Sequence, residues 1–216
     1  MSKPILVKIC GLTDEESMEA AIEGGADLVG VVFFDKSPRA VSLERAAELL
    51  QFVPDGVRRV GLFVDPEDAL LDAVMNHVRL DFFQLHGNEP PERVERLRLE
   101  YGMPVIKAVG VATADDLALA ENYTAVADWL MFDGKAPAAA ERPGGNAASF
   151  DWSILKERRW PCPWMLAGGL TATNVGEAIR RSGAKAVDVS SGVETAPGVK
   201  DPELIRQFIA AAKGKP

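Results

Sequence analysis

Cysteine and histidine are both scarce in this sequence, with two of each among 216 residues. Cys10 and Cys162 fall near opposite ends of the strand arrangement predicted below, beyond the Cα separation of about 7 Å that a disulfide tolerates. We therefore expect two reduced thiols. His77 falls near the end of a predicted helix and His86 follows a predicted strand, so the pair makes no convincing metal site.

Long apolar stretches and an excess of positive charge are also missing. No apolar run approaches the roughly 18 to 20 residues that span a bilayer, and the first residues lack the pattern of a signal peptide. We therefore expect a cytoplasmic protein with no membrane partner. The net charge of −8 argues against a nucleic-acid partner, because such a partner needs a concentrated basic face. An anionic substrate would have to be held by a local site.

Apolar residues, in contrast, are plentiful. Hydrophobic residues make up 47% of the chain and charged residues 26%, a balance typical of a soluble globular protein with a large core. A length of 216 residues also suits one (β/α)8 barrel, which commonly occupies about 200 to 250 residues. We therefore expect residues 1–216 to form a single domain.

Short runs rich in Val, Ile, Leu and Phe recur at nearly regular intervals, and the segments between most of them carry helical periodicity. Alternating strands and helices predict a parallel sheet with right-handed crossovers. Near-continuous apolar strands favour a closed barrel over an open, doubly wound sheet. The predicted strands are 4–10, 27–34, 57–64, 81–85, 104–111, 128–132, 162–167 and 186–190.

Helix boundaries carry their own signals. A Ser or Thr followed three residues later by Glu predicts a capping box, and an acid followed by proline predicts a helix start. Glycine just after a helical pattern predicts its end. The predicted starts are Thr13 with Glu16, Asp65 with Pro66, and Asp201 with Pro202, and the predicted ends are Gly24–Gly25 and Gly183.

Active sites of such barrels lie at the carboxyl ends of the strands. Cys10 ends the first predicted strand and precedes a capped helix, while Lys8, two residues earlier, projects to the same side. The positive helix end and the lysine both favour a reactive thiolate at Cys10. The alternative is a buried, inert cysteine.

Asp133 ends the sixth predicted strand, so its carboxyl group faces the same end of the barrel. Partial burial there would favour the neutral acid, which can donate a proton. The alternative is a turn or cap residue, since Gly134 follows directly.

Small residues follow the last two predicted strands, where these barrels commonly bind phosphate through backbone N–H groups and a helix N-terminus. Ordinary turn chemistry is the alternative. The candidate phosphate-binding residues are Gly168 and Gly169 after the seventh strand, and Ser190, Ser191 and Gly192 after the eighth.

Four further residues are weaker candidates. Arg39, after the second strand, can bind a carboxylate through two hydrogen bonds, although a solvated loop arginine is the alternative. The motif "QLHG" (84–87) places Gln84 and His86 after the fourth strand. Lys107, within the fifth strand, is either a cation inside the barrel or half of a structural ion pair.

The segment 134–149 is the longest connection, rich in Gly, Ala and Pro and without periodicity. Long structureless connections in compact domains are usually lids or tolerated insertions. We expect one of these two roles here.

In order along the chain, these motifs resemble the phosphoribosylanthranilate isomerase family, and the resemblance covers essentially the whole sequence. One departure is "GGNAASFDW" (144–152), where the family often has GGTGxxFDW, so Asn146 and Ala147 replace a threonine and a glycine. The matching motifs are "KICGLT" (8–13), "SPRAVS" (37–42), "VGLFVD" (60–65), "FQLHG" (83–87), "FD" (132–133), "FDW" (150–152), "LAGGL" (166–170) and "VDVSSGVE" (187–194).

The resemblance implies an isomerase of tryptophan biosynthesis that needs no cofactor or metal and acts on the phosphosugar N-(5′-phosphoribosyl)anthranilate. It implies that Cys10 is the general base, Asp133 the general acid and Arg39 the group that holds the anthranilate carboxylate. The glycine and serine loops would then hold the phosphate.

Two rival interpretations keep the phosphate loops. Indole-3-glycerol-phosphate synthase shares the barrel but relies on lysine and glutamate chemistry, which neither Cys10 nor the short chain favours. A non-catalytic phosphosugar-binding barrel would make no use of Cys10 and Asp133. We expect a monomer, with a dimer as the alternative.

Overall fold

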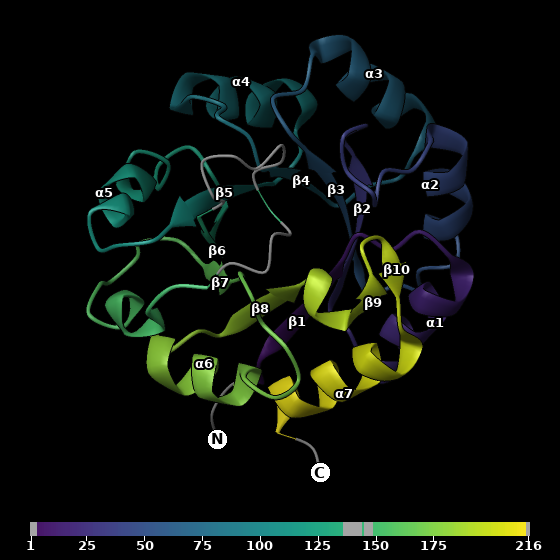
Figure 1. The fold of residues 1–216 in the computed structure, drawn as a ribbon. Coiled ribbons are helices and arrows are strands. Elements are labelled where there is room, and N and C mark those ends of the chain that lie inside the picture. Colours follow the sequence, from purple (N-terminus) through teal and green to yellow (C-terminus); the bar gives the residue numbers. More distant parts are fainter. Residues whose placement is uncertain (1–3, 136–143, 145–148, 215–216) are drawn as a thin grey trace.

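Eight parallel strands form a closed barrel in the computed structural model, which describes residues 4–135, 144 and 149–214. Each strand pairs with its neighbours along the chain, and β8 closes the ring against β1 (Figure 1). All eight predicted strands are present, although the sixth extends to Gly134. They are β1 (Leu6–Cys10), β2 (Leu28–Phe33), β3 (Arg58–Phe63), β4 (Phe82–Leu85), β5 (Val105–Val111), β6 (Trp129–Gly134), β7 (Trp164–Leu166) and β8 (Ala186–Val189).

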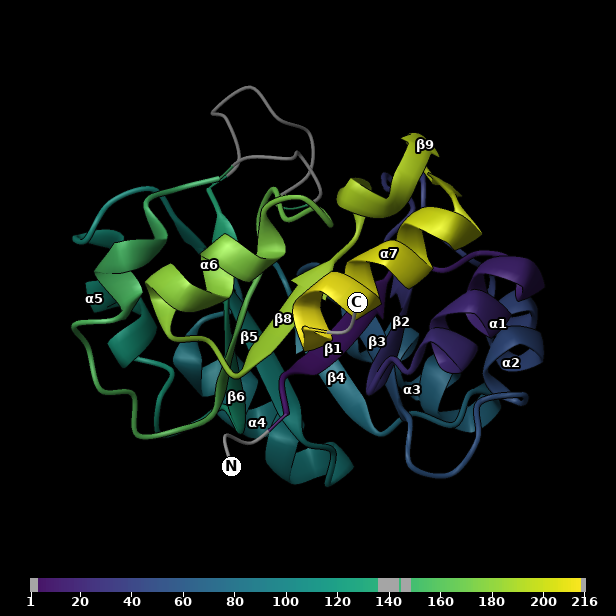
Figure 2. The same ribbon diagram turned by 90° about the horizontal axis from the view of Figure 1, so that it is seen from below.

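Helices surround the barrel, as Figures 1 and 2 show from two directions. Between β6 and β7 the described residues contain a 3₁₀ helix, η1 (Trp152–Leu155), where the other connections carry an α-helix. Most of the long connection, including Asn146 and Ala147, lies outside the described residues. The α-helices are α1 (Glu15–Gly24), α2 (Leu43–Leu50), α3 (Asp68–His77), α4 (Pro91–Tyr101), α5 (Asp116–Glu121), α6 (Val175–Ser182) and α7 (Pro202–Lys213).

Two of the three predicted helix starts are wrong. Asp14, with an extended backbone, caps α1 by accepting a 2.8 Å hydrogen bond from the Ser17 N–H, so Thr13 does not. Asp65 adopts a positive φ of 45° and accepts the Asn88 N–H at 2.7 Å, while α3 begins only at Asp68. The Asp65 carboxylate therefore binds a neighbouring loop and caps no helix. Asp201 is confirmed as the cap of α7.

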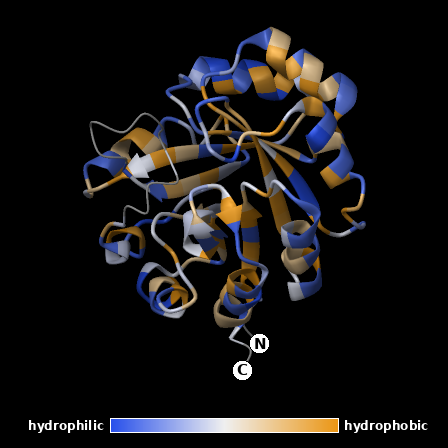
Figure 3. Ribbon diagram, turned by 45° about the vertical axis from the view of Figure 1, so that its right-hand side comes forward, coloured by the Kyte–Doolittle hydropathy of each residue, from blue (hydrophilic) through white to orange (hydrophobic). Residues whose placement is uncertain are grey.

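The predicted helix ends are confirmed. Gly25 and Gly183 follow α1 and α6 in the left-handed conformation, with φ of 92° and 77°. The residues of the barrel strands are mostly apolar, and each outer helix alternates apolar and polar stripes (Figure 3).

Alternate residues of each strand point into the barrel or out toward the helices. Inward residues form a small apolar cluster, most of which lies nearer the amino ends of the strands, although Ala167 directly follows β7. The cluster consists of Leu28, Val60, Ile106, Ala108, Met131, Met165, Ala167 and Ala186. Continuing along the same faces, Lys8 and Cys10 follow Leu6, Asp133 follows Met131, and Asp188 follows Ala186. The barrel interior is therefore apolar at its base and polar toward the carboxyl ends of the strands.

After β8 the chain forms a short 3₁₀ helix, η2 (Ser191–Val193), and a small antiparallel hairpin of β9 (Glu194–Ala196) and β10 (Val199–Lys200). Figure 2 shows β9 projecting beyond the barrel at the end where α7 begins. Within the described part of the chain, no helix is long and apolar enough to cross a membrane.

Candidate active site

A pocket opens at the carboxyl ends of the barrel strands, in the place where the sequence predicted a site. The sequence-predicted residues that line it are Cys10, Arg39, Gln84, His86, Asp133, Gly168, Gly169, Ser190, Ser191 and Gly192. Lys8 and Lys107 are not among the lining residues. The fold thus brings together residues that lie as much as 182 positions apart in the sequence, from Cys10 to Gly192.

Cys10 is buried beside a buried ion pair. The Lys8 ammonium lies 2.6 Å from an Asp188 carboxylate oxygen, and both residues lie on adjacent strands. Gly30, on β2, makes room for the group, because a Cβ there would lie 3.2 Å from the Cys10 sulfur and 3.4 Å from the Lys8 nitrogen. The sulfur and the ammonium therefore share one space inside the barrel.

Burial raises the pKa of the Cys10 thiol, and the Lys8 charge opposes this shift without cancelling it. For Lys8, burial lowers the pKa, but the Asp188 carboxylate and the Cys10 sulfur outweigh that effect, so the ammonium stays charged. The expectation that the thiolate is favoured at Cys10 is therefore wrong for the free pocket. Desolvation of the buried sulfur is the physical reason.

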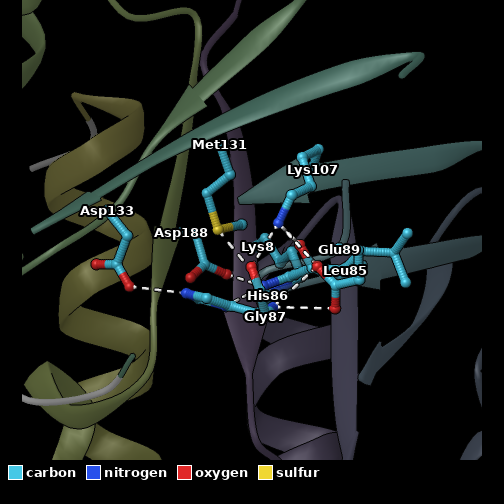
Figure 4. Close-up of polar contacts among 10 residues, drawn as sticks. Lys8, Leu85, His86, Gly87, Glu89, Lys107, Met131, Asp133 and Asp188 are labelled. Carbon is cyan, nitrogen blue, oxygen red and sulfur yellow. Dashed lines mark hydrogen bonds and ion pairs between the residues drawn. The ribbon is translucent and has the colours of Figure 1, made fainter. Parts of the chain in front are cut away.

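Asp133 forms the end of a chain of three polar side chains, of which Figure 4 shows the contact between Asp133 and His86. The Gln84 amide nitrogen donates to Nδ1 of His86 at 3.1 Å, which leaves the ring proton on Nε2. That nitrogen lies 3.1 Å from an Asp133 carboxylate oxygen. Gly144 lies close above, since a Cβ there would come within 3.0 Å of the same oxygen. Asp133 is thus held in place and only 7% exposed.

Lys107 lies on the outer face of the barrel, because it alternates with the inward-facing Ile106 and Ala108. The prediction of a cation inside the barrel is therefore wrong. Its ammonium binds the Glu89 carboxylate and the Gly87 carbonyl oxygen, each at 2.8 Å. Lys107 thus holds the loop that follows His86, as the structural ion-pair alternative requires (Figure 4).

Arg39 is buried, contrary to the alternative of a solvated loop arginine. Its Nε and Nη2 atoms donate to the two carboxylate oxygens of Glu194 at 2.6 and 2.7 Å. Lys200 binds the same carboxylate at 2.7 Å. The guanidinium therefore stands at the pocket wall in a fixed orientation.

The two small-residue loops form the remaining wall of the pocket. Gly168 and Gly169 have positive φ values of 88° and 62°, a conformation that favours glycine and lets the backbone turn sharply after β7. Asn174 fastens this loop by accepting the Thr171 N–H at 2.8 Å just before α6 begins. The arrangement provides backbone N–H groups and a helix N-terminus suited to an anion.

Three buried charged residues at the site escaped the sequence interpretation. Asp188 and Glu194 both lie within the motif "VDVSSGVE", so their position beside the serine loop was a usable signal. Lys200 gave none, because it lies in the hairpin beyond the motif. Among the described residues, no group of three potential ligands could hold a metal ion.

Comparisons with known proteins agree on one family. The family model for N-(5′-phosphoribosyl)anthranilate (PRA) isomerase matches residues 7–211. Proteins called N-(5′-phosphoribosyl)anthranilate isomerase are 64% identical in Paramagnetospirillum magneticum, with 98% of both chains covered, and 58% identical in Rhodospirillum rubrum, with 96% of this chain and 97% of the relative covered.

Solved structures give the same result. The crystal structure of phosphoribosyl anthranilate isomerase from Thermotoga maritima is 41% identical, with a TM-score of 0.87 over 97% of this chain and 99% of the other. A second such isomerase, in complex with reduced 1-(o-carboxyphenylamino)-1-deoxyribulose 5-phosphate, is 40% identical, with a TM-score of 0.84 and the same coverage.

Proposed function

The chain belongs to the N-(5′-phosphoribosyl)anthranilate isomerase family and is an isomerase of tryptophan biosynthesis, and from this premise we propose which residues carry out the reaction. Cys10 is the general base and Asp133 the general acid. Arg39 holds the carboxylate of the substrate. The loops at Gly168–Gly169 and 190–192 hold its phosphate.

The reaction converts N-(5′-phosphoribosyl)anthranilate to 1-(2-carboxyphenylamino)-1-deoxyribulose 5-phosphate. Asp133 protonates the furanose ring oxygen, the C1′–O bond breaks, and the nitrogen lone pair forms a Schiff base. Cys10, as the thiolate, then removes the proton from C2′, which gives an enolamine. Tautomerisation yields the ketone, so the atoms and electrons of the substrate are only rearranged.

One observation carries this assignment: Cys10 and Asp133 line the same pocket as Arg39 and both small-residue loops. The carboxylate and the phosphate lie at opposite ends of the substrate. Holding both groups would fix the two reacting carbons, which removes much of the entropic cost of reaction. The bound analogue in a solved relative has the same two groups, a carboxyphenyl ring and a 5-phosphate. Lys8 keeps a positive charge beside the base.

His86 is proposed as a positioning residue for the acid. Its Nε2–H donates to one Asp133 oxygen, which leaves the other oxygen to carry the proton that the substrate receives. Gln84 fixes the ring in this tautomer. Lys107 holds the loop behind His86 and makes no contact with substrate.

The test follows the loss of substrate fluorescence with an added synthase to trap the product. Cys10→Ala and Asp133→Asn should each lower kcat about 10²- to 10⁴-fold, the usual contribution of a positioned proton-transfer group. Cys162→Ala and Asp55→Asn are matched controls, since Cys162 is absent from the pocket lining and Asp55 is exposed. Near-normal kcat in a folded Cys10→Ala or Asp133→Asn variant would remove that residue from the mechanism.

The cellular location and the oligomeric state are also part of what we propose. We place the enzyme in the cytoplasm as a monomer acting on a small phosphosugar. One solved structure from Thermotoga maritima is of monomers generated from a dimeric isomerase, so both states occur for that relative. Light scattering of the purified protein is the decisive measurement of assembly here. A mass near twice 23.2 kDa would replace the monomer with a dimer.

A further inference from the structure

Three charged side chains form a buried cluster at the edge of the pocket, which we call the Arg39 cluster: Arg39, Glu194 and Lys200. The side chains of all three are at most 5% exposed. They come from the loop after β2 and from the β9–β10 hairpin, which lie against each other where Gly198 packs on the Pro38 carbonyl group. Figure 2 shows this hairpin beyond the end of the barrel, on the side of the molecule where β2 lies.

The cluster fixes how the guanidinium is presented. A guanidinium has five N–H donors in a rigid plane, and Glu194 accepts one from Nε and one from Nη2. The three remaining N–H groups belong to Nη1 and the far side of Nη2. These form the end-on edge of the fork, which can bind a second carboxylate through two parallel hydrogen bonds. Arg39 is among the residues that line the pocket, and Nη1 makes no hydrogen bond to another residue in the described part of the chain.

The Glu194 carboxylate pairs with two cations, Arg39 and Lys200. Burial raises the pKa of Glu194, but the hydrogen bond from Arg39 and the charge of Lys200 outweigh it, so the pKa is lowered and Glu194 stays ionised. Burial lowers the pKa of the Lys200 ammonium, and the Glu194 carboxylate opposes this shift without cancelling it. With Lys200 protonated, two cations and one anion give the cluster one net positive charge. A second anion, such as a substrate carboxylate, would neutralise it.

The cluster also reaches the second small-residue loop. Lys200 donates to the Ser190 carbonyl oxygen at 2.9 Å and to the Ser190 hydroxyl oxygen at 3.1 Å. The Arg39 side chain crosses above Gly11, where a Cβ would lie 3.2 Å from the Ser190 hydroxyl oxygen. The carboxylate of Glu194 therefore connects the proposed carboxylate anchor with the proposed phosphate loop.

We propose that Glu194 is a positioning residue that selects carboxylate-bearing substrates by holding Arg39 with the end-on edge of its guanidinium toward the pocket. Lys200 assists by balancing the charge of Glu194 and by tying it to Ser190. The inference rests on the proposed role of Arg39, and it adds the residue that makes the arginine selective.

The direction in which Glu194→Gln changes ligand affinity distinguishes a positioning role from simple electrostatic attraction. Glu194→Gln removes a negative charge beside the substrate, so Coulomb attraction alone would tighten the binding of every anionic ligand. Loss of orientation would instead weaken only a ligand that carries the carboxylate. General loosening of the pocket would weaken all ligands equally.

The test measures dissociation constants by calorimetry for two probes. One is reduced 1-(o-carboxyphenylamino)-1-deoxyribulose 5-phosphate, and the other is its phenylamino analogue, which keeps the phosphate and lacks the carboxylate. We expect Glu194→Gln to weaken the first about tenfold or more and to leave the second unchanged or tighter. In turnover, KM should rise while kcat stays near the wild-type value, because uniform binding is lost.

Two further variants complete the design. Glu194→Gln with Lys200→Met restores the single net positive charge but not the orientation, so it should remain selectively weak for the carboxylate probe. It also serves if the single variant fails to fold, which circular dichroism would show. Arg39→Lys keeps the charge but loses the fork, and it should lose the same selectivity.

The outcomes separate this inference from the proposed function. Arg39→Lys could weaken only the carboxylate probe while the folded Glu194 variants keep the wild-type selectivity. That result would overturn the role of Glu194 and keep that of Arg39. Unchanged selectivity in Arg39→Lys would overturn both. Equal weakening of both probes in the Glu194 variants would also overturn the inference, because it would show loosening of the pocket.

Discussion

The thiol of Cys10 experiences opposing influences that a pH profile can separate. Burial raises its pKa, the Lys8 charge lowers it, and Asp188 raises it by a smaller amount than Lys8 lowers it. At neutral pH most of the free enzyme therefore holds the thiol, and the thiolate that acts as base is a minor form. A buried cation beside the sulfur keeps that fraction from being smaller still.

It follows that the rate at which iodoacetamide alkylates Cys10 in a Cys162→Ala background, which reports the thiolate of Cys10 alone, should rise about tenfold per pH unit on the acid side of the Cys10 pKa. The double variant Lys8→Met with Asp188→Asn removes both charges, so it leaves no unpaired buried charge. Lys8 lowers the pKa of Cys10 more than Asp188 raises it, so loss of both should raise this pKa and move the rise to higher pH. Lys185→Met, at an exposed position, is the control. An unmoved rise would show that Lys8 does not influence the base.

The sequence predicted which residues meet in the pocket better than it predicted the contacts that each of them makes. Cys10, Asp133 and Arg39 could be found because strand ends are visible in the sequence and point to one face of a barrel. The Arg39–Glu194 contact could not, since it joins residues 155 positions apart. Desolvation of Cys10 was missed for the same reason, because burial depends on what the other strands place around it.

At the scale of elements, helix caps show where local patterns succeed and fail. Asp201 caps α7 through hydrogen bonds from the Glu203 and Leu204 N–H groups at 2.8 and 3.1 Å. Asp65 has the same acid–proline pattern, but its carboxylate is taken by the loop before α4. The strands were predicted well because each one is buried on both faces, which leaves a continuous apolar run in the sequence.

Asp201→Ala should lower the free energy of unfolding by roughly 0.5 to 2 kcal/mol, because two N–H groups at the start of α7 lose their acceptor. Because α7 packs against α1, a less stable α7 lowers the stability of the whole barrel. Urea denaturation measures the change. Asp115→Ala is the matched control, since Asp115 precedes α5 without any side-chain cap hydrogen bond, and its effect should be markedly smaller. Equal losses in the two variants would contradict the cap as the cause.

At the scale of the whole molecule, the pocket exists only when the barrel is closed. Its walls come from the first strand at Cys10, the sixth at Asp133 and the turn after the eighth at Ser190. Pairing of β1 with β8 brings the two ends of the chain together. With a net charge of −8, the protein as a whole repels an anionic substrate, so attraction must come from the local cations and N–H groups of this closed pocket.

A ligand that needs the closed barrel should stabilise the molecule as one unit. For a ligand that binds only the folded state, each tenfold increase above its dissociation constant should add about 1.4 kcal/mol to the free energy of unfolding. We expect the reduced product analogue to give this slope in urea titrations, with fluorescence and circular dichroism reporting the same transition. A shallower slope, or two separated transitions, would mean that part of the chain binds or unfolds independently and would contradict our proposal that residues 1–216 act as a single domain. The stabilisation should be smaller in Arg39→Lys at equal ligand concentration, because one anchor of the closed pocket is weakened.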